Sequence, residues 1–142
     1  VQMSIYNDIR AALESRLAAT VGLPTGIAYE NVSFEPQTGT SFLKVAFVPT
    51  SRRPAVRGPN PQQRYQGVFR VFCYAPEGSG PSAADNMANT VIDAFDATTD
   101  ISFTNAANET VIVSVDYAER DNGFVDSPWY YTVVNIGWYI YS

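Results

Sequence analysis

SFLKVAFVPTSRRPAVRGPNPQQRYQGVFRVFCYA, residues 41–75, predicts two β-strands joined by an unusually long connection. In the first run, 41–48, Leu43, Val45 and Phe47 fall on one face. In the second run, 65–75, Phe69, Val71 and Cys73 do the same. Such alternation with a period of two is typical of strands with one buried face. The connection between them, 49–64, exceeds the usual hairpin length of about two to five residues.

This connection, which we call the arm (49–64), is also the most basic part of the chain. It carries Arg52, Arg53, Arg57 and Arg64, four of the nine basic residues, and no acidic residue. The rest of the chain has five basic residues against 14 acidic ones, and the net charge of the whole is −5. The four prolines of the arm restrict its backbone. Arginine suits bidentate binding of carboxylate or phosphate. We predict that these four arginines contact a neighbouring subunit or another protein of an assembly, with nucleic acid as the alternative.

The remaining segments predict an α+β fold in a single domain, 1–142. We expect helices at 4–21 and 81–97, where apolar residues recur at helical spacing. We expect strands at 110–119 and 129–142, joined by a turn at Asn122-Gly123, and short strands at 27–29 and 101–103. The order favours an antiparallel or mixed sheet with two helices packed on one face and a long basic β-hairpin arm.

The last strand, WYYTVVNIGWYIYS (129–142), is apolar or aromatic on both faces. Trp129, Tyr131, Tyr139 and Tyr141 alternate on one face, whereas Val134, Ile136 and Trp138 lie on the other. A sheet with one solvated face should instead alternate apolar with polar residues. Two interpretations stay open: an aromatic-rich core strand, or a subunit interface formed by Trp129, Tyr131, Tyr139 and Tyr141.

No catalytic, cofactor or metal site is expected from the sequence. The chain has no histidine, and neither GxxxxGK[ST] nor GxGxxG occurs, which removes the common triads and nucleotide-binding loops. The single cysteine, Cys73, lies among apolar residues in a predicted strand and is expected to be an inert core residue. We also expect no transmembrane helix and no secretory signal.

Four segments together resemble the tail terminator (tail-completion) proteins of long-tailed phages of the siphophage type. They are SIYNDIRAALESRLAA (4–19), SRRPAVRG (51–58), ADNMANTVIDAFDA (84–97) and WYYTVVNIGWYIY (129–141). The resemblance covers nearly the whole chain in element order and length.

The resemblance implies a non-enzymatic virion protein, made in the host cytoplasm, with no cofactor and no membrane association. It implies a homohexameric ring on the head-proximal end of the tail tube that ends tube polymerisation. The partners are then the tail tube protein, the head-tail connector and DNA, which passes through the lumen without specific recognition. Two alternatives remain: a head-completion or neck protein, and a cytoplasmic binding module whose basic arm contacts nucleic acid.

Overall fold

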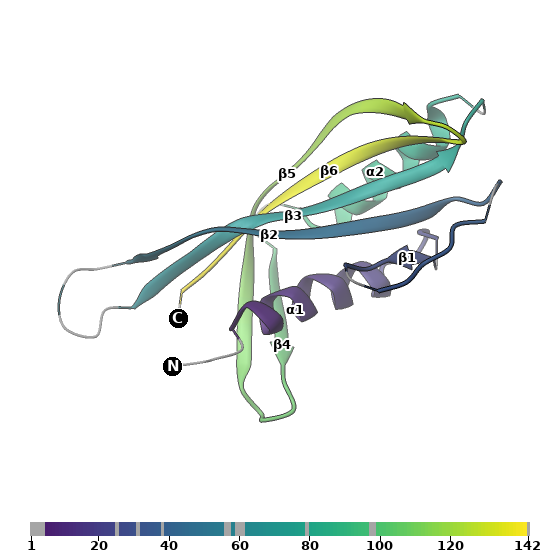
Figure 1. Ribbon diagram of the computed structural model, residues 1–142. Helices are drawn as coiled ribbons and strands as arrows, with labels where there is room; N and C mark the ends of the chain where they lie inside the picture. Colours follow the sequence, from purple (N-terminus) through teal and green to yellow (C-terminus); the bar gives the residue numbers. More distant parts are fainter. Residues whose placement is uncertain are drawn as a thin grey trace.

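Six strands and two helices make up the protein (Figure 1), in a computed structural model that describes residues 5–24, 26–30, 32–37, 39–55, 58, 62–78, 80–96 and 99–141. In chain order they are α1 (Ile5–Ala19), β1 (Ile27–Ala28), β2 (Phe42–Pro54), β3 (Gln63–Pro76), α2 (Ser82–Ala94), β4 (Asp100–Thr104), β5 (Thr110–Asp126) and β6 (Trp129–Tyr141). The α+β class is therefore confirmed.

All six strands form one mixed sheet in the order β1-β2-β3-β6-β5-β4. Only the short β1–β2 pair is parallel; every other neighbouring pair is antiparallel. The centre is β3 against β6, paired without a break from Arg64–Tyr141 to Pro76–Trp129. Two long strands in continuous register give the sheet its rigid axis.

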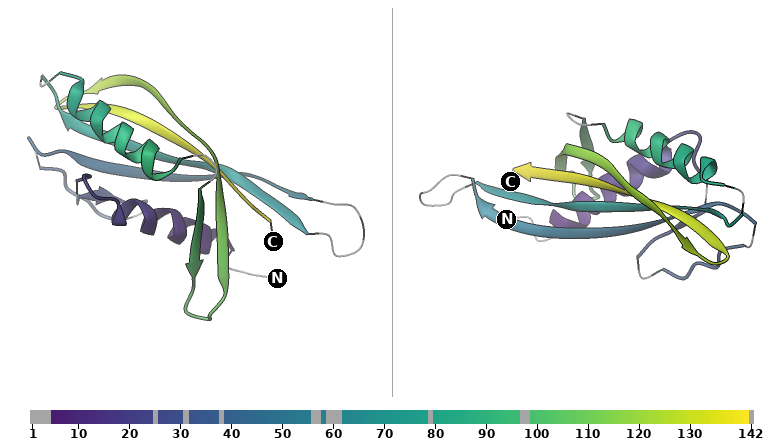
Figure 2. Two further views of the ribbon diagram at one scale, coloured as in Figure 1. Left: turned by 180° about the vertical axis from the view of Figure 1, so that it is seen from behind. Right: turned by 90° about the horizontal axis from the view of Figure 1, so that it is seen from above.

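The sheet is strongly curled. Figures 1 and 2 show β4 and the adjoining half of β5 running across the direction of β2 and β3. The register of β5 against β6 shifts twice, between Val115 and Tyr117 and between Arg120 and Gly123. Such irregularities bend a strand and increase its twist, which accounts for the curl.

One large buried cluster holds the fold together. It combines the apolar stripes of both helices with alternate side chains of β2, β3, β5 and β6. Burial of a single large apolar side chain, such as leucine or phenylalanine, stabilises the fold by about 1.5–3 kcal/mol. The fully enclosed members with the largest side chains include Trp138, Phe69, Phe95, Ile9, Leu13, Leu17, Leu43 and Ile136.

The predicted helices are slightly too long. The first ends at Ala19 rather than 21, because Gly22 adopts a positive φ of 93° and Val21 is left 91% exposed. Its predicted first residue, Ser4, lies outside the described residues. The second helix spans Ser82–Ala94.

The predicted turn at Asn122-Gly123 is wrong. β5 continues through both residues to Asp126, and the reversal falls at 127–128, where the Ser127–Pro128 peptide bond is cis. Gly123 is needed for a different reason: the ring of Tyr130 occupies the space that its Cβ would take. The glycine accommodates an aromatic ring at an irregularity in the strand rather than a tight turn.

Gly137 on β6 has the same role beneath Tyr117, and this pairing gives a stability test. An added Cβ at 137 meets the Tyr117 ring, so Gly137→Ala should destabilise the fold by about 1–3 kcal/mol. Chemical denaturation of Gly137→Ala, Tyr117→Ala and the double variant measures the coupling. If the ring is the obstacle, the double variant is no less stable than Tyr117→Ala alone; simple additivity contradicts the explanation.

Cys73 is confirmed as a core residue, and it should be unreactive. Its side chain is fully buried, and burial raises the pKa of the thiol to about 12. Because the thiolate is the reacting species, a thiol reagent at pH 8 should label the folded protein only as fast as it unfolds. Rapid stoichiometric labelling without denaturant would contradict this.

Candidate assembly surface

A second, smaller aromatic cluster lies on the sheet face opposite the main core. Its buried members are Phe42 at the start of β2, Tyr74 near the end of β3 and Trp129 at the start of β6. Strand register explains the grouping, since Phe42 pairs with Tyr74 and Tyr74 with Tyr131. Partly buried rings complete what we call the outer aromatic face: Phe34, Phe42, Phe72, Tyr74, Trp129 and Tyr131.

The rings of the outer aromatic face pack directly on one another. Phe42 and Tyr74 are stacked, with centroids 4.5 Å apart, and the Trp129 ring meets Phe42 edge-on at 5.0 Å. Tyr131 stacks on Tyr74 at 4.8 Å. Each such pair contributes about 0.5–1.5 kcal/mol beyond its area, so the surface is pre-formed.

The predicted interface residues at this end of β6 differ in exposure. Trp129 is only 7% exposed and supports the cluster from within, whereas Tyr131 is half-buried. Beside Tyr131 on β5, the Phe124 ring lies 5.6 Å away and is 48% exposed. The apolar surface therefore continues onto β5, where Phe124 is exposed to solvent.

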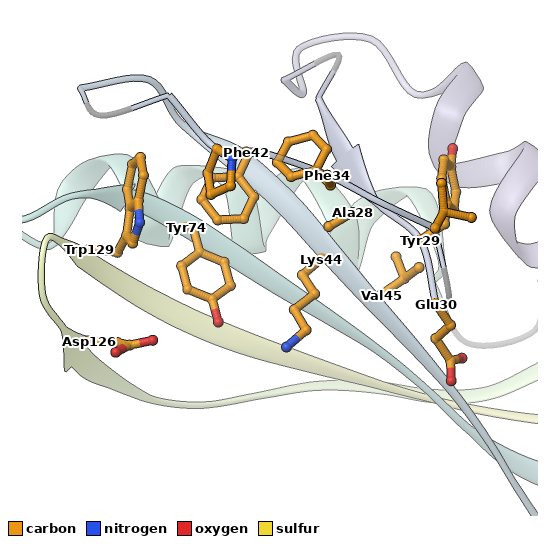
Figure 3. Close-up of a pocket in the computed structure, with 12 residues that line it drawn as sticks. Ala28, Tyr29, Glu30, Phe34, Phe42, Lys44, Val45, Tyr74, Asp126 and Trp129 are labelled. Atoms are coloured by element: carbon orange, nitrogen blue, oxygen red, sulfur yellow. The ribbon is translucent and has the colours of Figure 1, made fainter.

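A pocket of about 430 Å³ adjoins this face (Figure 3). Aromatic rings from Phe34, Phe42 and Tyr74 line it, and Lys44 and Asp126 add charge. Burial raises the pKa of Tyr74, and the nearby Tyr131 and Asp126 raise it further. The phenol therefore stays neutral at physiological pH and acts as a hydrogen-bonding group.

The two strands reach further into the arm than the sequence predicted. Instead of ending at 48 and starting at 65, β2 extends to Pro54 and β3 begins at Gln63. The ladder shifts register between Pro49 and Ser51 and then continues to Pro54–Gln63. A bulge admits a residue that cannot donate to the ladder, which is why Pro49 does not end the strand.

Register divides the arm arginines between the two faces of the hairpin. Arg64 lies over two rings of β6, 4.8 Å from the Tyr139 centroid and 5.8 Å from that of Tyr141. Arg53 is directly opposite Arg64 and is exposed. Arg52 stacks instead on Tyr65, a member of the main core, at 5.5 Å. Arg57 lies outside the described residues.

The structure therefore brings together Arg53, Arg64, Tyr139 and Tyr141, but it separates them from Trp129 and Tyr131 at the other end of β6. Sequence reasoning missed Phe42 and Tyr74, which join Trp129. The signal was present, because both are aromatic and occupy the strand positions that alternate with the core residues Leu43 and Cys73.

The described residues give no indication of a metal centre or a membrane span. They contain no group of three or more cysteine, aspartate or glutamate side chains suited to hold a metal ion. None of the helices within the described ranges combines the length and apolar character that crossing a bilayer requires.

Comparison with known proteins identifies the family. A solved structure of another protein superposes with a TM-score of 0.71 at 23% identity, covering 99% of this chain and 97% of that one, which supports the fold alone. The comparison with curated proteins gives no match. The family model described as phage tail terminator protein matches residues 8–138, nearly the whole sequence. The chain belongs to the phage tail terminator family, whose members are structural components of the virion tail.

Proposed function

We propose that this protein forms a homohexameric ring on the head-proximal end of the phage tail tube. The ring ends polymerisation of the tube and provides the surface to which the head-tail connector docks. DNA passes through its lumen without specific recognition, and the protein is made in the host cytoplasm before it joins the virion. The observation that carries this proposal is the family match over residues 8–138.

The distribution of aromatic residues supports assembly through a face of the sheet. In this proposal both helices cover one face, and the outer aromatic face contacts a neighbouring copy or the tube. Tyr131 and the exposed Phe124 contribute contact area there, while the buried Trp129 holds the cluster rigid. Interfaces are enriched in aromatic side chains because these bury large areas with little loss of entropy.

Assembly by strand pairing along the β2 edge is disfavoured. The backbone N–H of Phe47 donates to Glu30 Oε1 at 2.6 Å, so it is already satisfied. Pro49, two residues on, has no N–H to offer. A sheet edge with its donors capped or missing resists addition of another strand.

Charge also fits this function. The acidic body repels duplex DNA, which favours passage over binding. The basic arm is the exception, and we propose that it contacts protein rather than phosphate. A closed ring needs a head-to-tail interface, in which one surface of a copy meets a different surface of the next.

Capping of tail tubes tests the proposal. Purified protein added to tube protein under polymerising conditions should limit tube length, and electron microscopy should find a ring at one end of each tube. Loss of the gene should give tails of uncontrolled length. Tubes of unchanged length without terminal rings, together with normal tails in the knockout, exclude the function.

Phe124→Glu tests the outer aromatic face. Placing a charge beside Tyr131 should reduce ring formation on tubes about tenfold or more, because the interface would bury an unpaired carboxylate. Val21→Glu is the control: Val21 is 91% exposed, follows the end of α1 and lies outside the cluster. Equal loss in both variants, measured at equal thermal stability, contradicts a specific role for this face.

A further inference from the structure

The end of the β2–β3 hairpin presents two like charges directly opposite each other. Arg53 and Arg64 are cross-strand partners, an arrangement that destabilises an isolated sheet. Arg64 is fixed by the rings of Tyr139 and Tyr141, and its Nε is buried without a hydrogen-bond partner in the described structure. We call these four residues the arginine platform.

The arginine platform has no acidic partner within the described chain. Among the described residues, one ion pair forms between side chains, and it joins Arg120 to Asp85. This ion pair lies on the opposite side of the sheet from the platform. Neither Arg53 nor Arg64 lies within salt-bridge distance of an aspartate or glutamate there. The two guanidinium groups are therefore arranged for a carboxylate that comes from elsewhere.

An excess of negative charge occurs between α1 and the segment after β1. Glu14 and Glu30 line a pocket of about 420 Å³ together with Arg10 and Tyr29. Burial raises the pKa of Glu14; Arg10 opposes the shift, and repulsion from Glu30 adds to it. The guanidinium of Arg10 also lies over the Phe47 ring, 5.1 Å from its centroid. Two carboxylates and one guanidinium therefore line the pocket.

These two sites cannot meet within one copy. Glu30 accepts a hydrogen bond from the backbone of Phe47 on β2. Arg53 lies six residues further along β2. At roughly 3.3 Å per residue, the separation is about 20 Å, more than an arginine side chain spans. Different surfaces of opposite charge at separate places on one chain are the requirement for a head-to-tail contact between copies.

We propose that the arginine platform of one copy binds the Glu14–Glu30 pocket of the next copy in the ring. The contact relieves both like-charge pairs, because each guanidinium gains a carboxylate and the two glutamates gain positive charge in addition to that of Arg10. Arg64, held by two tyrosines, loses little conformational freedom on binding. This inference rests on the proposed ring and identifies one of its subunit contacts.

Complementary charge reversal tests the contact. One variant carries Arg53→Glu and Arg64→Glu; the other carries Glu14→Arg and Glu30→Arg. Each should fail to form rings alone, in solution or on tail tubes, because like charges then face each other. Mixed in equal amounts they should restore rings, since every junction again joins opposite charges. Light scattering and electron microscopy measure the assembly.

A control separates this contact from a general effect of charge. Asp93→Arg with Asp116→Arg makes the same change in net charge as Glu14→Arg with Glu30→Arg, but at two exposed positions elsewhere, and it should leave rings intact. Glu30 accepts a hydrogen bond from the backbone N–H of Phe47, so replacing it can lower thermal stability. If the variant with both Glu14→Arg and Glu30→Arg is less stable, Glu14→Arg alone is used in its place.

The outcomes distinguish this inference from the proposed function. If the unmodified protein forms rings but the mixture does not, the contact is wrong and the ring stands. If the unmodified protein forms no ring even on tubes, both fail. If Arg53→Glu with Arg64→Glu still forms rings but loses salt-sensitive binding to a duplex oligonucleotide, the platform binds phosphate and the subunit contact is excluded.

Discussion

Pairing of β3 with β6 is the constraint on which the rest of the structure depends. Its register runs unbroken from Arg64–Tyr141 to Pro76–Trp129 and assigns every side chain of both strands to a face. A shift of one residue in the register of these strands would move Val71 and Ile136 from the core face to the opposite face and turn Tyr74 toward the core. The same register stacks Arg64 on Tyr139, so the fold and the candidate assembly surface are specified by one set of hydrogen bonds.

The two faces of this pair have different roles. On one face, side chains such as Phe69, Val71, Ile136 and Trp138 belong to the main buried core. On the other, rings pack mainly on rings, and part of their surface stays open at Tyr131 and Phe124. An aromatic face that is already packed needs little rearrangement on contact with a partner. This arrangement fits the proposed assembly of several copies.

The spacing of apolar residues was enough to predict the class, the central strands and both helices: alternation indicated the strands, and recurrence every three or four residues indicated the helices. Cys73 was correctly assigned to the core because its neighbours alternate. The errors were local. Asn122-Gly123 indicated a turn, but the glycine accommodates Tyr130, a contact that only the register reveals. The two strands that flank the arm were predicted to end at 48 and to start at 65, but the bulge at Pro49 let their pairing continue to Pro54–Gln63. The grouping of Phe42 with Trp129, and of Arg64 with Tyr139, depends on strand order, which spacing along the chain does not specify.

The burial of Cys73 has a practical consequence. Because the only thiol of the chain is enclosed and held protonated, the native protein is in effect cysteine-free toward solvent. A cysteine introduced on the hairpin or the outer face would be the one position open to a fluorophore, a spin label or a crosslinker. In the proposed ring, distances between copies could then be measured without first removing any residue from the core.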